Sequence, residues 1–124
     1  RRGLANSDAL SDAEAAAYEA PFPTAASKAG AVAWPLLVPM TPNDPGADVM
    51  RETRARLASW TKPALVLFAP DDPILGDAHH FFRSLLPTAS DQPHITIDNA
   101  GHFLQEEQGP RIAQHVLDFV DRTG

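Results

Sequence analysis

The sequence contains no cysteine, no excess of basic residues and no long hydrophobic run. The lack of cysteine excludes disulfides, thiolate zinc sites and a cysteine nucleophile within this chain. With 10 basic against 16 acidic residues, its formal charge of −6 disfavours binding to nucleic acid or to an anionic membrane surface. The clearest apolar run, residues 64–69, is far shorter than the roughly 20 residues that a membrane-spanning helix needs. What remains is 124 residues with 44% hydrophobic content, the length and composition of one globular domain.

A proline-rich stretch, residues 39–45, divides the chain into two parts. Before it, the capping box of Ser11 to Glu14 predicts a short helix over about residues 12–19, and a second short helix is expected over residues 26–34 before a proline. After it, apolar residues at three- and four-residue spacing predict an amphipathic helix that ends at Trp60, whose side chain is expected in the core.

The remaining segments alternate between strand and helix patterns. Residues 64–69 are apolar on both faces and lie between prolines, which predicts a buried parallel strand. A helical stripe over residues 81–86 follows, then an alternating strand over residues 94–98, and Gly109-Pro110 predicts the start of a last helix. This order is typical of the end of an α/β fold. Two parallel strands alone leave a sheet edge unpaired, so we expect the chain to be the C-terminal part of a larger α/β protein, and the missing initial Met agrees with that.

Polar residues follow both expected strands. Asp71 and Asp72 come after the first strand, and Gly101 and His102 come after the second. Because neighbouring parallel strands end at the same edge of a sheet, a carboxylate of the first loop is expected to reach His102. The carboxylate would accept a hydrogen bond from the imidazole Nδ1–H, so that Nε2 could act as a base. Gly101 would allow a tight turn of the backbone before His102. An acidic pair after a strand is also ordinary turn chemistry, and Asp98 is a rival acid whose position favours a cap or turn.

Several motifs are missing from the chain. There is no G-x-S-x-G nucleophile elbow, no glycine-rich phosphate loop and no H-E-x-x-H metal motif. His79 and His80 are adjacent, so on a helix they diverge by about 100° and cannot bind one ion from one face. His94 and His115 fit exposed positions on a strand and a helix. The sequence therefore implies neither a metal nor a cofactor.

Four segments, in order and across nearly the whole chain, resemble the C-terminal part of haloalkane dehalogenases, which are α/β hydrolases. They are residues 18–23 (YEAPFP), 34–39 (WPLLVP), 72–76 (DPILG) and 101–106 (GHFLQE). The last two segments indicate only the α/β-hydrolase superfamily, whereas the first two are narrower signals. The resemblance implies an α/β chain in which residues 1–41 are the end of a helical cap. Residues 42–124 would be the C-terminal part of an α/β-hydrolase core, with parallel strands and flanking helices.

The resemblance also implies a site and a reaction. By motif, Asp72 would be the partner acid and His102 the base of a hydrolase that converts small apolar haloalkanes and water to alcohol and halide. An aspartate nucleophile and two halide-binding groups would precede residue 1, in the missing N-terminal part of the same fold. The implied substrate-binding residues are Trp34, Pro35, Val38, Ile74, Leu75 and Phe103. For Trp34 and Val38, ordinary packing within the cap is an equally good interpretation.

Two other functions remain open. Another capped α/β hydrolase, such as an epoxide hydrolase or a serine esterase, would share the same acid and base, and only its nucleophile segment would distinguish it. A non-enzymatic interpretation is an inactive fragment or interaction module that keeps vestigial residues.

Overall fold

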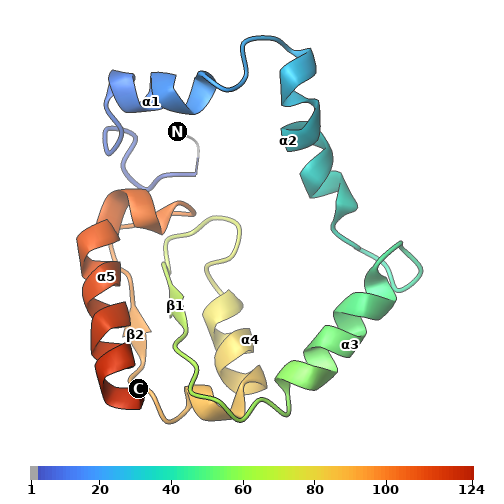
Figure 1. The fold of residues 1–124 in the computed structure, drawn as a ribbon, viewed down its shortest axis with the longest axis vertical. Helices are drawn as coiled ribbons and strands as arrows, with labels where there is room; N and C mark the ends of the chain where they lie inside the picture. Colours follow the sequence, from blue (N-terminus) through green and yellow to red (C-terminus); the bar gives the residue numbers. More distant parts are fainter. Residues whose placement is uncertain (1–2) are drawn as a thin grey trace. The chain divides into compact units, whose positions relative to one another are not determined.

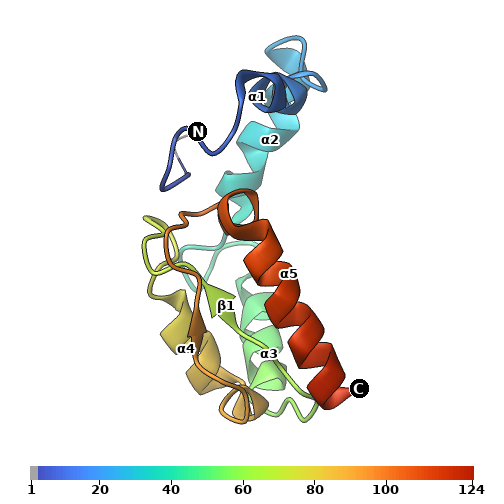
Figure 2. The same ribbon diagram turned by 90° about the vertical axis from the view of Figure 1, so that its left-hand side faces the viewer.

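The computed structural model describes residues 3–124 of the chain (Figures 1 and 2). They form two compact units, residues 11–56 and residues 3–10 together with 57–124. The predicted boundary between cap and core, at residues 41 and 42, stays a prediction, because compactness does not tell which parent domain a segment belongs to. The elements in chain order are α1 (Asp12–Glu19), the 3-10 helix η1 (Ala26–Lys28), α2 (Ala29–Ala33), η2 (Trp34–Leu37), α3 (Ala47–Leu57), β1 (Leu67–Phe68), α4 (Ala78–Leu85), η3 (Pro87–Ala89), β2 (Ile95–Thr96) and α5 (Leu104–Thr123).

Helix α1 begins with the predicted capping box. The Ser11 hydroxyl accepts from the Glu14 amide at 3.3 Å, and the Glu14 carboxylate accepts from the Ser11 amide at 2.8 Å. The second predicted helix is found as three consecutive short helices, η1, α2 and η2. It runs past the expected end at Trp34, because Pro35 lies in the first turn of η2, where a missing N–H costs no hydrogen bond.

Helix α3 ends three residues before Trp60. The apolar face that the pattern predicted therefore does not extend to Trp60, which is 40% exposed, and the prediction that Trp60 belongs to the core is wrong. Val49 and Met50, on α3 itself, are 59% and 58% exposed. The helix is amphipathic as predicted, but Val49 and Met50 of its apolar residues face solvent within this chain, whereas Ala47 is buried.

Strands β1 and β2 pair in parallel, with Leu67 opposite Ile95 and Phe68 opposite Thr96. The predicted parallel pairing is confirmed, although both strands are shorter than the segments predicted for them, residues 64–69 and 94–98. A strand is defined by backbone hydrogen bonds with its neighbouring strand. Here the pairing covers two residues in each strand. The last hydrogen bond of the pair runs from the Ile97 amide to the Phe68 carbonyl, at 2.9 Å.

A helix flanks the small sheet on each side, so that β1 and β2 lie between α4 and α5 (Figure 1). Phe82 of α4 stacks on Phe68 with ring centroids 5.9 Å apart. On the other side the core consists of buried residues after the two strands and partly buried residues of the strands and α5: Ala69, Ile97, Ala100, Leu67, Ile95, Leu104 and Ile112. This arrangement confirms the predicted α/β architecture of parallel strands with flanking helices.

The last helix begins earlier than predicted. Helix α5 starts at Leu104 and contains a kink at Gln108, whose backbone angles are φ −131° and ψ 29°. Pro110 therefore lies in the first turn after the kink rather than at the start of the helix. No helix within residues 3–124 is both long and apolar enough to cross a membrane.

Candidate active site

Asp72 lies in a tight loop that follows β1. Its backbone amide donates to the Ala69 carbonyl at 3.2 Å, and its carbonyl accepts from the Gly76 amide at 3.0 Å. A Cβ at position 76 would lie 2.8 Å from the carbonyl oxygens of Asp72 and Pro70, so only glycine closes this loop without displacement. The loop leaves the Asp72 side chain only 5% exposed. Its Oδ1 accepts from the Ile74 amide at 2.8 Å.

His102 lies in the loop that follows β2, which turns at Asn99 with a positive φ of 59°. Asparagine tolerates this left-handed conformation better than most residues. The left-handed residue of this loop is therefore Asn99 rather than Gly101, and Gly101 is important for a close approach. A Cβ there would lie 2.5 Å from the Gly3 carbonyl oxygen and 2.7 Å from the Ala5 nitrogen. Glycine at position 101 lets residues 3–5 pack directly on the loop.

The two loops bring Asp72 and His102 together, with 3.0 Å between Asp72 Oδ2 and His102 Nδ1. Burial alone would raise the pKa of the Asp72 carboxyl, but the hydrogen bond from His102 and those from the amides of Ile74 and Leu75 hold it below its usual value. Because an ionised carboxylate only accepts, Nδ1 carries the proton, and Nε2 of the neutral ring has a free lone pair. The pair can thus take a proton from a water molecule and stabilise the imidazolium that results.

The other acidic candidates have different surroundings. Asp98 accepts from the Thr96 hydroxyl at 3.0 Å and lies 3.8 Å from the Arg111 guanidinium. This is the turn and cap chemistry expected of a residue at a strand end. Asp71 is exposed. Of the three acids considered from the sequence, Asp72 is the one that contacts His102.

Three of the predicted substrate-binding residues lie beside this pair. Ile74 and Leu75, 66% and 46% exposed, belong to the same loop as Asp72. The ring of Phe103 lies edge-on to the His102 imidazole with centroids 5.2 Å apart, and Phe103 is 47% exposed. Apolar side chains therefore project from both loops that carry the acid and the base.

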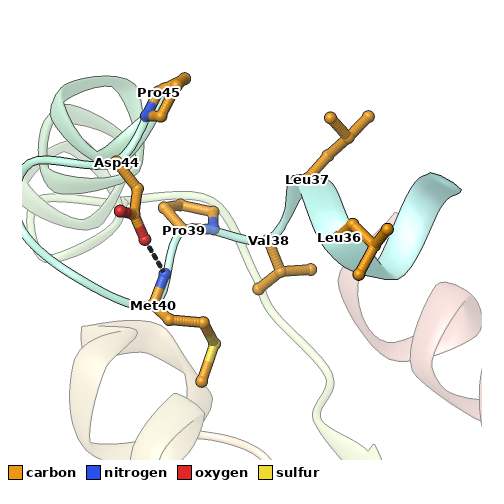
Figure 3. A pocket seen from close by; sticks show the side chains of 7 residues that line it. All are labelled: Leu36, Leu37, Val38, Pro39, Met40, Asp44 and Pro45. Carbon is orange, nitrogen blue, oxygen red and sulfur yellow. Dashed lines mark hydrogen bonds between the residues drawn. The ribbon is translucent and has the colours of Figure 1, made fainter.

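The other three predicted substrate-binding residues, Trp34, Pro35 and Val38, belong to the second unit and are exposed within it. Val38 lines a hollow of about 340 Å³, shown in Figure 3, together with Leu36, Leu37, Pro39, Met40, Asp44 and Pro45. The Asp44 carboxylate shapes the hollow by accepting from the amides of Met40 and Thr41, each at 2.8 Å. Trp34 and Pro35 are not among the residues that line this hollow. A role of these residues in substrate binding stays a prediction.

Comparison with known proteins gives several relatives, whereas no protein-family model matches the chain. It is 42% identical over 111 residues to a haloalkane dehalogenase of Psychrobacter cryohalolentis, covering 90% of this chain and 37% of that protein. It is 44% identical over 104 residues to a haloalkane dehalogenase of Mycolicibacterium paratuberculosis, covering 84% and 34%. Haloalkane dehalogenase 1 of Mycobacterium tuberculosis is 42% identical over 108 residues, with 87% and 36% covered. The resemblance to haloalkane dehalogenases is confirmed.

The chain spans little more than a third of the length of the dehalogenases that it matches. A helix-rich chain with a small parallel sheet fits the C-terminal part of an α/β-hydrolase fold preceded by the end of a helical cap. The dehalogenase resemblance and the fold therefore agree.

The remaining histidines of this dehalogenase-like chain are not arranged as metal ligands. Among residues 3–124, no three or more side chains of the types His, Asp and Glu gather at a point where they could hold an ion. His79 is buried, with Nδ1 2.9 Å from the Gly76 carbonyl oxygen, and its ring packs on His80 and His94 with centroids 3.7 and 5.6 Å away.

The prediction that His115 is exposed is wrong. His115 is partly buried, and its Nε2 is buried without a hydrogen-bond partner among the residues that the structure describes. It lies three residues after Ile112, which packs on the core, so the two share a helix face. The three-residue spacing between Ile112 and His115 already indicated that His115 lies on the apolar face of this helix.

No sequence pattern points to a role for residues 3–6 at the site. The Gly3 carbonyl accepts from the amides of His102 and Phe103, at 2.6 and 3.4 Å. Nothing in hydrophobic periodicity signals such a contact, because it joins backbone groups about a hundred residues apart. A local hint is Gly3 itself, since glycine allows close approach of two backbones.

Proposed function

We propose that this chain is the C-terminal part of a haloalkane dehalogenase, with residues 1–41 in the cap and residues 42–124 in the core. The observation that carries the proposal is the 3.0 Å contact between His102 Nδ1 and Asp72 Oδ2 at the carboxyl ends of two neighbouring parallel strands. The dehalogenase relatives support the reaction class. The N-terminal part of the same fold would supply the nucleophile and the halide-binding groups.

The reaction takes two steps. In the first, a carboxylate oxygen of the upstream aspartate attacks the carbon that bears the halogen, so that a carbon–oxygen bond forms and halide leaves with the electron pair. In the second, His102 Nε2 takes a proton from water, and the hydroxide formed attacks the carbonyl carbon of the ester. The acyl–oxygen bond breaks, and the alcohol leaves with a proton returned from His102. Asp72 stabilises the imidazolium between the two proton transfers.

The surroundings of the pair suit a small apolar substrate. Ile74, Leu75 and Phe103 project from the loops that carry Asp72 and His102. We assign them to the substrate pocket, together with Trp34, Pro35 and Val38 of the cap. An apolar pocket binds a haloalkane by burying its surface and removes water from the attacking carboxylate. No metal or cofactor takes part in either step.

The test uses the full-length protein with His102→Gln, incubated with a small bromoalkane. The amide of glutamine is not a base, so alkylation proceeds and ester hydrolysis stops. We expect about one halide released per protein molecule and a mass increase equal to one alkyl group, measured by intact mass spectrometry. The matched control is His80→Gln, which removes an exposed histidine of α4 and is expected to turn over like the parent.

Two outcomes would contradict the proposal. Halide turnover by the parent without an alkyl adduct in the His102→Gln variant would refute the assigned role of His102. Absence of halide release by the parent from chloro-, bromo- and iodoalkanes would favour another capped hydrolase, to be tested with epoxides and esters. Inactivity toward all three substrate classes would favour the non-enzymatic interpretation.

A further inference from the structure

Glu107, the fourth residue of α5, accepts hydrogen bonds from three backbone amides. Its Oε2 accepts from Gly101 at 2.7 Å and from Ala5 at 3.0 Å, and its Oε1 accepts from Asn6 at 2.6 Å. These amides belong to two segments that lie far apart in the sequence, residues 5–6 and the loop that carries His102. One carboxylate therefore joins the N-terminal segment, the His102 loop and α5.

Independent contacts reinforce the same junction. The His102 amide donates to the Gly3 carbonyl at 2.6 Å. Gly101 allows the two segments to approach closely, because a Cβ at this position would lie 2.5 Å from the Gly3 oxygen. The backbone of Gly101 and His102 is thus held by hydrogen bonds to Glu107 and to the Gly3 carbonyl.

The charge of Glu107 suits this arrangement. Burial alone would raise the pKa of the Glu107 carboxyl, but the amides of Gly101, Asn6 and Ala5 hold it below its usual value. An ionised carboxylate accepts on both oxygens, whereas a neutral amide side chain accepts on one and presents N–H groups on the other. Replacement by glutamine would therefore set an N–H group against at least one backbone donor.

We propose that Glu107 is a positioning residue for ester hydrolysis, fixing the His102 backbone so that the imidazole stays on Asp72 and its Nε2 faces the attacking water. The proposal rests on the proposed function of the Asp72–His102 pair. Only one peptide unit separates the Gly101 nitrogen, which Glu107 binds, from the His102 Cα. A displacement of a catalytic base by about 1 Å can cost about a hundredfold in rate.

The test is Glu107→Gln in the full-length protein, with the two steps of the reaction measured separately. In a single turnover with a bromoalkane, we expect halide release to stay within about twofold of the parent, because alkylation does not use His102. Decay of the alkyl ester, followed by intact mass after quenching, is expected to slow by about ten- to a hundredfold. A loss of folded protein would lower the amount of ester formed but would not slow its decay.

Asp121→Asn is the matched control, because it removes the same charge from an exposed position near the other end of α5. Its ester is expected to decay at the parent rate. Glu107→Asp keeps the charge on a side chain one methylene shorter, which cannot reach all three amides, and should slow decay by several-fold. If Glu107→Gln does not fold, the rate of ester decay in Glu107→Asp tests the positioning role instead.

Decay at the parent rate in either Glu107 variant overturns the positioning role while leaving the proposed function intact. A parent protein that forms no ester overturns the proposed function, and the positioning role with it. Equal slowing in Asp121→Asn would show a general effect of charge, and would also overturn the proposal.

Discussion

At Asp72 the two carboxylate oxygens have different partners. Oδ1 accepts from the Ile74 amide at 2.8 Å, and Oδ2 accepts from His102 Nδ1 at 3.0 Å. The backbone of the loop thus determines which oxygen faces the imidazole. Because a carboxylate offers no proton to Nδ1, this geometry selects the tautomer in which Nε2 is the base. The orientation of the Asp72 side chain therefore determines which nitrogen of His102 carries the proton.

The variant Asp72→Asn should reverse that tautomer. If the amide oxygen keeps its bond to Ile74, the amide nitrogen faces Nδ1 as a donor, and the imidazole proton moves to Nε2. We expect ester hydrolysis to slow by about a hundredfold or more, with the first release of halide unchanged. Stopped-flow halide detection and intact mass of the accumulated ester measure the two effects.

Asp98→Asn is the control for this substitution. Asp98 loses the same charge, but its carboxylate faces Thr96 and Arg111 rather than His102. Hydrolysis in this variant is expected to match the parent. If Asp98→Asn were the slower of the two, Asp72 would not be the partner acid.

Among the elements, α1 has a start that is determined by local chemistry. Its capping box satisfies the amide of Glu14 with the Ser11 hydroxyl and the amide of Ser11 with the Glu14 carboxylate. The helix has no buried residue, so its stability depends on such local contacts more than on burial. In contrast, β1 and β2 are defined by their mutual pairing and by the helices that flank them.

Replacing Ser11 by alanine is expected to cost α1 about 1 kcal/mol, because the Glu14 amide loses its acceptor within the helix cap. Local opening should then increase about fivefold, which is the population change that this free energy corresponds to. Amide hydrogen exchange at residues 14–19 of the full-length protein measures it. Ser7→Ala, outside the helix, is the control and should leave these amides unchanged. Equal exchange in the two variants would show that the cap does not stabilise α1.

At the scale of the whole chain, few large apolar side chains are fully buried among the described residues. Ile97 is the one large side chain that is fully buried among the described residues, whereas Trp34, Leu36 and Met40 are 73%, 81% and 84% exposed. Exposed apolar surface of this kind marks a region that another part of a protein covers. We expect the rest of the proposed dehalogenase to cover it.

The 124-residue chain in isolation is therefore expected to show no dehalogenase turnover. It contains the proposed acid and base but lacks the upstream carboxylate that would form the ester, and removing one member of a cooperative catalytic set abolishes most of the rate. Halide release from a bromoalkane, compared with the full-length protein at equal concentration, measures this. Its exposed apolar residues should also enhance the fluorescence of a hydrophobic dye above that of the full-length protein. Catalytic halide release by the isolated chain would contradict the proposal that the nucleophile lies upstream.

Features that depend on neighbouring residues or on a regular period could be predicted from the amino-acid sequence. The capping box of α1, the amphipathic α3, the apolar run of β1 and the alternating segment of β2 belong to this class, because local sequence and side-chain spacing indicate strand or helix directly. The contact of Asp72 with His102 was also predictable, since parallel strands carry the loops after them to one edge.

The contacts between groups that lie far apart in the sequence became known from the three-dimensional structure. The close approach that Gly101 allows and the three amides on Glu107 depend on residues 3–6 packing beside the loop of His102 and the start of α5. The lengths of β1 and β2 likewise depend on where the two strands run in register. Neither composition nor periodicity contains this information, because backbone hydrogen bonds between distant segments involve groups that every residue possesses.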